Sequence, residues 1–420
     1  MCCSPHSCGS SFWRDHMTSE FDAERRCPVV HTDYRRDRPA FTTIPQLGEE
    51  RELAPAVWND STEHGFLMVQ RYDDVMELLK QTDVLVSDNV NAFDPHMQIP
   101  LIPNSLNPPE HTKVRRVLNP FFSPAAVKRL EPLARERAES LIGALAEKKS
   151  VDLVSEFAIL YPTELFLALL GLPTEDGEMV LPWVEAIFGG FFASTPEELQ
   201  AAGDAVASFN EYFGKLVDER SADPGDPEID LVSRLLVAEI DGVPMSREDI
   251  LVTCMTLMTA GLDTTRSALG YIFHQLATEP DVRHRMVNEP ESWPRFIEEA
   301  IRVNSLIIQD GRQVKEDMEV LGCPMKAGEM VWLGLAAANR DPRKFEDPDT
   351  FDMDREGLNH HLGFGAGVHR CIGMHLARAE LVIALETWHK VIPDYRLSPG
   401  AELTERGGQL RLQTLPLEWD

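Results

Sequence analysis

The sequence has few basic residues for its length, and it lacks any long hydrophobic run. Its 40 lysines and arginines are outnumbered by 69 aspartates and glutamates, which gives a net charge of −29. Such a charge repels nucleic acids and anionic membrane surfaces, so neither is expected as a partner. No apolar stretch reaches the roughly 18 residues of a membrane helix, and residues 1–28 hold no apolar segment typical of a secretion signal. We therefore expect a cytoplasmic protein with no membrane association.

Disulfide spacing and domain linkers are also absent from the sequence. The seven cysteines follow no disulfide pattern, which suits a reducing compartment. No linker rich in Pro, Gly or Ser and no internal repeat divides the chain, so we expect a disordered tail over residues 1–28 and one monomeric domain over residues 29–420. Helical patterns dominate that domain, and short strands are expected at 66–69, 313–334 and 391–420. The predicted fold class is mainly α with small antiparallel β-sheets.

A glycine-rich loop around one cysteine, His360–Gly373, is the most informative stretch of the chain. Its glycines permit positive φ angles and let a flat ligand approach the backbone. Helical spacing predicts a helix over Met374–Trp388, and the positive end of that helix favours a thiolate at Cys371. From these residues alone, Cys371 is an inert buried cysteine, an axial thiolate for haem iron, or part of a zinc site with the nearby histidines His360, His361, His369 and His375.

A second informative stretch begins at Ser246, which forms a capping-box-like helix start with Asp249. Residues 250–262 are apolar almost all round, so we expect this part of the helix to be buried on every side. Asp263 interrupts the apolar run beside Thr264, and a buried carboxylate is costly unless it is paired or used. Two interpretations stay open: a kink stabilised by threonine hydroxyls, or a groove that holds a small ligand beside a proton-delivering acid and an alcohol.

Four separated motifs stand in an order that resembles that of the cytochromes P-450. The cysteine loop carries the pattern Phe-Gly-x-Gly-x-His-x-Cys-x-Gly over Phe364–Gly373. The other three motifs lie upstream, at Ala260–Thr265, at Glu299 with Arg302, and at Asn339–Pro342. A weaker likeness to the camphor-hydroxylase group is carried by Asp310–Arg312. The resemblance implies the fold of this family, with haem b between a distal oxygen-binding helix and the proximal cysteine loop.

The resemblance also implies a role for each matching residue. On the proximal side, Cys371 is expected to be the axial haem ligand, next to Phe364 and Gly373. On the distal side, Ala260 and Gly261 are expected to contact the cofactor, while Thr264 and Asp263 form the catalytic pair that hydrogen-bonds the activated oxygen and relays protons to it. Four cations are expected to pair with the haem propionates: His111, Arg115, Arg312 and His369. Three residues are expected to fix the segment before the cysteine loop: Glu299, Arg302 and Arg355.

The implied reaction inserts one atom of O₂ into a C–H bond, while the other atom leaves as water and NAD(P)H supplies two electrons. The sequence has no cluster-spaced cysteines and no Gly-rich nucleotide fingerprint. We therefore expect a separate ferredoxin and an NAD(P)H-dependent ferredoxin reductase. An acidic ferredoxin is expected to dock on a basic spot at the cysteine side of the haem, formed by Lys113, Arg115, Arg116 and Arg370.

Apolar residues at the positions of the family's pocket favour a small hydrophobic substrate, terpenoid-like or alicyclic, although steroids, fatty acids and aromatics stay open. The expected pocket residues are Phe93, Ile99, Leu101, Phe188, Phe191, Phe192, Leu257, Leu306, Ile307 and Ile308. Two other functions share the haem loop. A hydroperoxide-driven peroxygenase does not need the acid–alcohol pair, and a non-enzymatic haem-based sensor needs neither electrons nor a proton relay.

Overall fold

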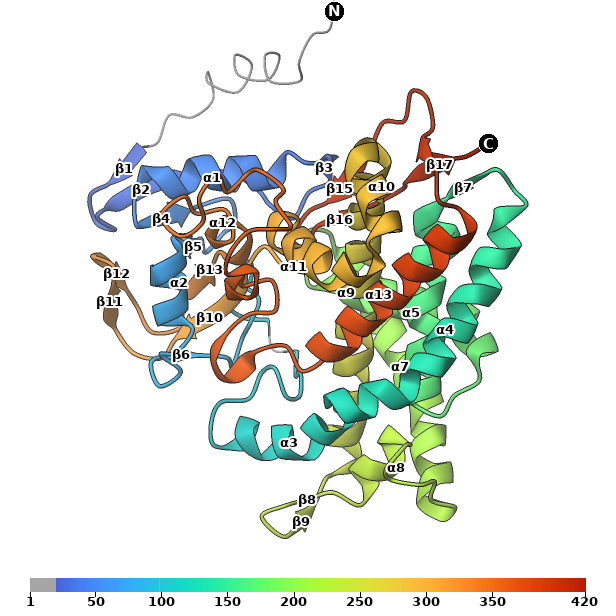
Figure 1. Ribbon diagram of the computed structural model, residues 1–420. Coiled ribbons are helices and arrows are strands. Elements are labelled where there is room, and N and C mark those ends of the chain that lie inside the picture. Colours follow the sequence, from blue (N-terminus) through green and yellow to red (C-terminus); the bar gives the residue numbers. More distant parts are fainter. Residues whose placement is uncertain (1–19, 98) are drawn as a thin grey trace, which may run out of the picture.

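The computed structural model describes residues 20–97 and 99–420, and helices dominate this part of the chain (Figure 1). The longer helices are α4 (Pro124–Ala146), α5 (Leu160–Leu169), α6 (Gly177–Gly190), α7 (Pro196–Ala222), α9 (Arg247–Thr278) and α13 (Met374–Val391). The shorter ones are α1 (Thr43–Leu53), α2 (Tyr72–Leu78), α3 (Glu110–Leu118), α8 (Leu231–Leu236), α10 (Pro280–Asn288), α11 (Trp293–Val303) and α12 (Leu335–Ala338). None of these helices is long and apolar enough to cross a membrane.

A seven-stranded sheet lies on one side of the molecule, at the left of Figure 1, and most of the long helices lie on the other. Its strands are, in spatial order, β1 (Glu20–Asp22), β2 (Cys27–Val30), β4 (Ala56–Asn59), β5 (Phe66–Val69), β13 (Met330–Leu333), β10 (Asp310–Val314) and β6 (Leu85–Val86). Two of its pairs are parallel, β2 with β4 and β5 with β13. The largest sheet is therefore mixed, which the local pattern of residues 313–334 does not reveal because β5 lies far away in the sequence.

The remaining strands form small antiparallel sheets, as predicted. One sheet contains β14 (Arg396–Leu397), β17 (Pro416–Glu418) and β7 (Ser150–Asp152), and a second contains β16 (Arg411–Leu412), β15 (Thr404–Arg406) and β3 (Arg38–Pro39). Two hairpins complete the set, β8 (Glu239–Ile240) with β9 (Val243–Pro244), and β11 (Met318–Val320) with β12 (Cys323–Met325). The fold class, mainly α with small sheets, is confirmed.

The predicted boundary of the N-terminal tail is wrong at its inner end. Strand β1 and the first residues of β2 lie inside the range 1–28, and the two strands pair with each other over Glu20–Asp22 and Cys27–Val29. Backbone pairing to β4 orders this segment, although its side chains show no strong apolar pattern. Residues 1–19 of the predicted tail lie outside the described part of the chain.

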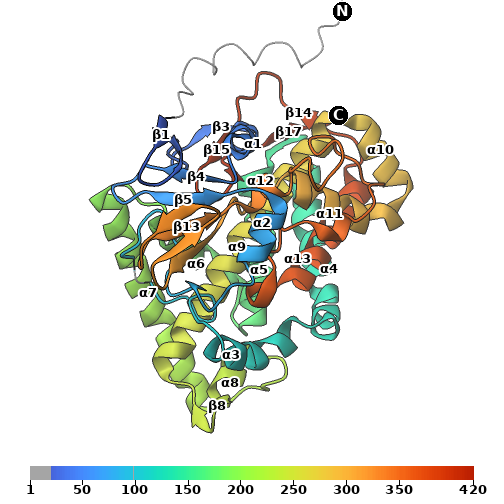
Figure 2. The ribbon, with the colours of Figure 1, turned by 90° about the vertical axis from the view of Figure 1, so that its left-hand side faces the viewer.

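Helix α9 runs through the middle of the helical half and is the element on which the site is built (Figures 1 and 2). It packs against α5, α6, α7 and α13, and α13 in turn packs along α4. The Ser246 hydroxyl caps the start of α9 by accepting the backbone N–H of Asp249 at 3.0 Å, as the capping pattern predicts. Large apolar side chains such as Phe157, Phe273 and Trp388 fill the interior around it.

Candidate active site

The cysteine loop is shaped by glycines with left-handed backbone conformations. Gly365 and Gly367 have φ angles of +64° and +66°, and a side chain at Gly367 would meet the carbonyl oxygen of Leu79 at 2.8 Å. The Cys371 N–H donates to the carbonyl of Phe364 at 2.9 Å, which closes the loop just before α13 begins. The loop therefore presents Cys371 at the start of a helix, where positive charge favours a thiolate.

Cys371 is exposed, whereas the other cysteines in the described residues, Cys27, Cys254 and Cys323, are buried. Although the residue is exposed, protein atoms crowd around the sulfur, and this desolvation raises the pKa of the Cys371 thiol, while the backbone N–H of Gly373 and the Arg115 guanidinium oppose the rise. The exposure argues against an inert buried cysteine. The zinc interpretation is also wrong for the described residues, because no three His, Cys, Asp or Glu side chains among them gather as a metal site.

Four predicted propionate partners lie close together near the loop. The rings of His111 and His369 have centroids 4.1 Å apart, and both nitrogens of the buried His111 lack a hydrogen-bond partner among the described residues. Burial, together with Arg115 and Arg312, lowers the pKa of His111 to about 4. Burial and the charge of Arg312 lower the pKa of His369 to about 3. A cluster of this kind, with unpaired donors and mutual repulsion, fits the binding of carboxylate groups.

Two members of this cluster already have partners within the chain. Arg312 is bonded to Asp310 on the same strand, at 2.5 and 2.8 Å, so its charge is largely neutralised. Arg115 donates to the backbone carbonyl of Arg370 at 3.0 Å and to Asn119 at 3.1 Å. Only Arg115 of these two therefore retains a charge without a carboxylate partner in the described residues.

Helix α9 is not buried on every side, contrary to the prediction from its composition. Ala260 is exposed, and Gly261 and Thr264 are partly exposed, while their neighbours Leu262 and Asp263 are buried. The Thr264 hydroxyl donates to the carbonyl of Ala260 at 2.8 Å. Because Ala260 and Gly261 have small or no side chains, one face of the helix is uncovered at this point, and the Thr264 hydroxyl lies beside this uncovered face.

Asp263 has partners that the sequence did not reveal. Its carboxylate accepts a hydrogen bond from Arg411 at 2.7 Å and from Gln409 at 2.9 Å, both near strand β16. Arg266, one helical turn away, lies 4.0 Å from the same carboxylate and binds Glu185 of α6 at 2.5 Å. This cluster connects α9, α6 and the C-terminal hairpin, and its arginines neutralise the buried charge of Asp263.

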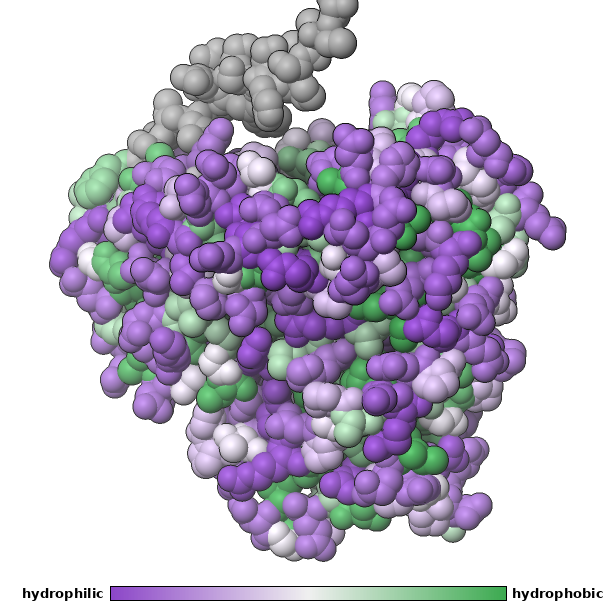
Figure 3. Space-filling model, viewed as in Figure 1, coloured by the Kyte–Doolittle hydropathy of each residue, from purple (hydrophilic) through white to green (hydrophobic). Residues whose placement is uncertain are grey.

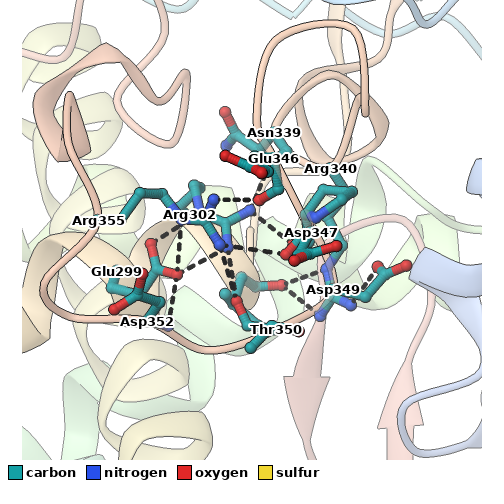
Figure 4. Close-up of polar contacts among 12 residues, drawn as sticks. Glu299, Arg302, Asn339, Arg340, Glu346, Asp347, Asp349, Thr350, Asp352 and Arg355 are labelled. Atoms are coloured by element: carbon teal, nitrogen blue, oxygen red, sulfur yellow. Dashed lines mark hydrogen bonds and ion pairs between the residues drawn. The ribbon is translucent and has the colours of Figure 1, made fainter.

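Glu299, Arg302 and Arg355 meet in the interior before the cysteine loop (Figure 4). Arg302 binds the Glu299 carboxylate through two bonds of 2.7 Å, and both side chains are fully buried. Arg355 reaches the same carboxylate at 3.3 Å. The other guanidinium hydrogens of Arg302 bind the backbone carbonyls of Asn339, Pro348 and Thr350, so the whole segment is fixed to α11.

Two further residues fasten the cysteine loop itself. The Asn339 side chain accepts the backbone N–H of Leu362 at 2.6 Å. Glu298 of α11 binds His361 at 3.1 Å and Arg378 of α13 at 2.5 and 2.7 Å. Burial alone would raise the pKa of Glu298, but the bonds from Arg378 and His361 outweigh it and lower this pKa to about 2. Glu298 was missed from the sequence, because nothing local shows that its partners lie 63 and 80 residues away.

The predicted docking residues do not all offer free charge. Lys113 binds Asp241 at 2.6 Å and Glu110 at 3.5 Å. Arg116 and Arg370 are exposed, and neither forms an ion pair with a carboxylate in the described residues. The face of the molecule seen in Figure 3 is largely hydrophilic. Because the net charge is −29, exposed cations of this kind are a minority among the charged residues.

The predicted pocket residues divide into two groups. The partly buried ones are Ile99, Phe188, Phe191, Phe192, Leu306 and Ile307, and the buried ones are Phe93, Leu101, Leu257 and Ile308. Phe192 lies at the centre of an aromatic group, 5.5 Å from Phe188 and 6.0 Å from Phe93 between ring centroids. Ile308 is fully buried in the main core, and its assignment to the pocket stays a prediction.

Comparisons with known proteins agree with this geometry. The cytochrome P450 family model matches residues 187–399. A probable cytochrome P450 127A1 of Sinorhizobium fredii is 33% identical over 84% of each chain. The mycinamicin IV hydroxylase/epoxidase of Micromonospora griseorubida is 33% identical over 91% of this chain and 97% of its own. Among solved structures, the crystal structure of CYP101J2 has a TM-score of 0.84 and 27% sequence identity, over 95% of this chain and 98% of its own.

An exposed cysteine in a glycine loop, a helix with an acid–alcohol pair and a buried Glu–Arg–Arg group together define a haem-thiolate enzyme. The chain belongs to the cytochrome P450 family. It is an oxidoreductase, a monooxygenase that uses haem b with a cysteine thiolate ligand and O₂.

Proposed function

We propose that this monooxygenase hydroxylates a small hydrophobic substrate, terpenoid-like or alicyclic, with electrons from a separate ferredoxin and its NAD(P)H-dependent reductase. The observation that carries the haem assignment is the exposed thiol of Cys371, held in a glycine loop at the start of α13. We also infer that the protein works in the cytoplasm as a monomer. This agrees with its negative net charge and with the cysteines of the described residues, which form no disulfide.

Cys371 supplies the axial ligand in this proposal, and His111, Arg115 and His369 hold the haem propionates. A carboxylate placed among these three would accept hydrogen bonds from the ring nitrogens of His111 that now lack a partner. It would also raise the pKa values of both histidines toward their ordinary range, because it offsets the charges of Arg115 and Arg312. When bound, thiolate-ligated haem supplies the activation of O₂ and the insertion of one oxygen atom into a C–H bond.

Thr264 and Asp263 handle protons in this proposal. The Thr264 hydroxyl lies on the open face of α9, where it can give up its hydrogen bond to the Ala260 carbonyl and donate one to the O₂ that the enzyme binds. Asp263 is oriented by Arg411 and Gln409, which each bond one carboxylate oxygen, and the remaining lone pairs of these oxygens can take up and pass on a proton. The acid–alcohol pair favours a monooxygenase over a hydroperoxide-driven peroxygenase or a sensor, which do not need it.

The substrate class rests on the aromatic side chains at the junction of α6 and α7. Phe188, Phe191 and Phe192 are partly buried and pack on one another, so they offer apolar surface with few polar groups. A Cβ at Gly408 would lie 2.2 Å from the Phe192 ring, so the C-terminal turn closes tightly over this group. This apolar surface suits a compact hydrophobic molecule better than a large polar one.

An optical titration of the ferric, haem-loaded protein tests the substrate class. The panel contains monoterpenoids, steroids, fatty acids and a macrolide, since one relative is named for its action on mycinamicin IV. We expect a saturable low-spin to high-spin shift with the compact terpenoids at the lowest concentration. A response to the macrolide or the fatty acids alone would contradict the proposed class. Oxygen binding without turnover, with any ferredoxin tried, would favour the sensor.

A further inference from the structure

Two buried cysteines from distant parts of the chain lie side by side at the edge of the main sheet. Cys27 is the first residue of β2, and Cys323 is the first residue of β12. Each is 2% exposed, both are free, and both belong to the same buried apolar cluster. The two thiols lie close enough that each shifts the pKa of the other.

Two ion pairs next to Cys27 hold the β1–β2 turn against β11 and against the residue before β13. Arg25 binds Glu329 through bonds of 2.7 and 2.8 Å and stacks 3.8 Å above the ring of Trp58. Arg26, next to Cys27, lies 3.5 Å from Glu319 on β11. Figure 1 shows the turn between β1 and β2 close to the end of the β11–β12 hairpin. The contact between the thiols is therefore part of a wider interface between the hairpins.

The surroundings of the two sulfur atoms are not equivalent. The interaction with Cys27 and the charges of Arg25 and Arg26 lower the pKa of the Cys323 thiol. The interaction with Cys323 and burial raise the pKa of the Cys27 thiol. Cys323 therefore loses its proton first and is the better nucleophile of the pair, while Cys27 keeps its proton nearby.

We propose that Cys27 and Cys323 form a peroxide-sensitive dithiol that closes to a disulfide between β2 and β12. The Cys323 thiolate attacks one oxygen of hydrogen peroxide, the O–O bond breaks, and hydroxide leaves and takes up a proton to give water and a sulfenic acid. The Cys27 sulfur then attacks the sulfur of that sulfenic acid, and the displaced hydroxide takes the Cys27 proton. In total, two thiols and one hydrogen peroxide give one disulfide and two molecules of water.

The position of the pair allows an oxidant to reach it despite the burial. Strand β1 is the edge strand of the sheet, and it covers β2 through only three register pairs. Edge elements of this kind open more easily than the core, so Cys27 and Cys323 are exposed in brief local openings. Once closed, the disulfide would join two segments almost 300 residues apart and stabilise the N-terminal hairpin against opening.

Mass spectrometry on the full-length, haem-loaded protein tests the proposal. The protein is treated with a small excess of hydrogen peroxide, free thiols are alkylated, and the protein is digested without reduction. We expect a linked peptide pair that contains Cys27 and Cys323, lighter by two hydrogen atoms than the two reduced peptides and separated by dithiothreitol. Diamide, which oxidises thiols without supplying an oxygen atom, should give the same pair.

Single variants then test the effect of the link. Peroxide should raise the unfolding temperature of the wild type by a few degrees, and this shift should vanish in Cys27→Ser and Cys323→Ser. Cys254→Ser, which removes a buried cysteine elsewhere, is the matched control and should keep the shift. Retention of both alkylated thiols in the wild type, over-oxidation of Cys323 without a link, or a disulfide to a different cysteine would overturn the proposal. The first measurement needs no variant, so a folding defect in Cys27→Ser does not obscure it.

Discussion

Thr264 and Asp263 are neighbours in the chain, yet their side chains have different surroundings. Among the described residues, the Thr264 hydroxyl bonds only to its own helix, at Ala260, and it lies on the exposed face of α9. The Asp263 carboxylate turns to Arg411 and Gln409, in the buried part of the structure. A change at Thr264 therefore affects the open face alone, whereas a change at Asp263 also leaves Arg411 without its partner.

Replacing Thr264 by alanine should uncouple the reaction without unfolding the protein. The hydroxyl makes a single local bond, so its loss costs little stability, about 1 kcal/mol or less. Proton delivery at the open face should fail, and most of the NAD(P)H consumed should then appear as hydrogen peroxide in place of product. The measurement is the ratio of product to NAD(P)H, with peroxide determined in parallel.

Thr259→Ala is the matched control for this variant. The Thr259 hydroxyl also bonds back to its own helix, to the Met255 carbonyl at 2.9 Å, but it is buried away from the open face. It should keep normal coupling, and Thr264→Ser should restore much of it. Unchanged coupling in Thr264→Ala would show that protons arrive by another route.

At the scale of elements, the cysteine loop is held between α11 and α13 by one carboxylate. Glu298 on α11 binds His361 in the loop and Arg378 on α13, and these bonds lower its pKa from 4.5 to about 2 against the effect of burial. Because the folded pKa is depressed, the stabilisation is complete above the unfolded value of 4.5 and is lost as the pH falls toward 2. Solvent screening reduces the free energy that corresponds to this pKa shift, so we estimate that the bonds of Glu298 stabilise the folded protein by about 2 kcal/mol.

Glu298→Gln should therefore lower the free energy of unfolding at pH 7 and weaken its decline between pH 4.5 and 2. Urea unfolding curves across this pH range provide the measurement, with haem retention followed by absorbance. Glu386→Gln, which removes a partner of Arg135 from the same helix α13, is the control and should retain the acid dependence. An identical pH profile in wild type and Glu298→Gln would contradict the assigned role.

Local sequence signals predicted those parts of the site whose residues lie within one short segment of the chain. The glycines around Cys371, the cap at Ser246 and the pair Glu299–Arg302 each depend on residues a few positions apart. The partners of Asp263 could not be predicted in this way, because Arg411 lies 148 residues further along the chain. Burial was equally hard to assign, since one apolar residue type, phenylalanine, lies in the core at Phe93 and is partly exposed at Phe191.

At the scale of the whole molecule, the net charge is −29, so in the proposed function an acidic ferredoxin would dock on the few exposed cations near the cysteine loop that have no carboxylate partner in the described residues. Arg116 is one of them, on the exposed side of α3, while Lys113 on the same helix is already paired with Asp241. Arg116→Glu should raise the ferredoxin concentration needed for half-maximal turnover several-fold at low salt. The difference from wild type should shrink as salt screens the charges.

Lys390→Glu is the matched control for charge, since Lys390 is exposed near the far end of α13. It changes the net charge by the same amount but should leave the dependence on ferredoxin unaltered. Equal effects of both variants would mean that overall charge, and not a local contact at Arg116, governs the encounter. No effect of either variant would place the docking site elsewhere.

The most direct measurement of the central claim is the absorbance spectrum of the reduced, CO-bound protein, in the wild type and in Cys371→His. Thiolate ligation gives the CO complex a Soret band at markedly longer wavelength than histidine ligation does. We predict the long-wavelength band in the wild type and its replacement by the short-wavelength band in Cys371→His, with haem still bound. A wild-type protein without the long-wavelength band, or a variant that keeps it, would show that Cys371 is not the haem ligand.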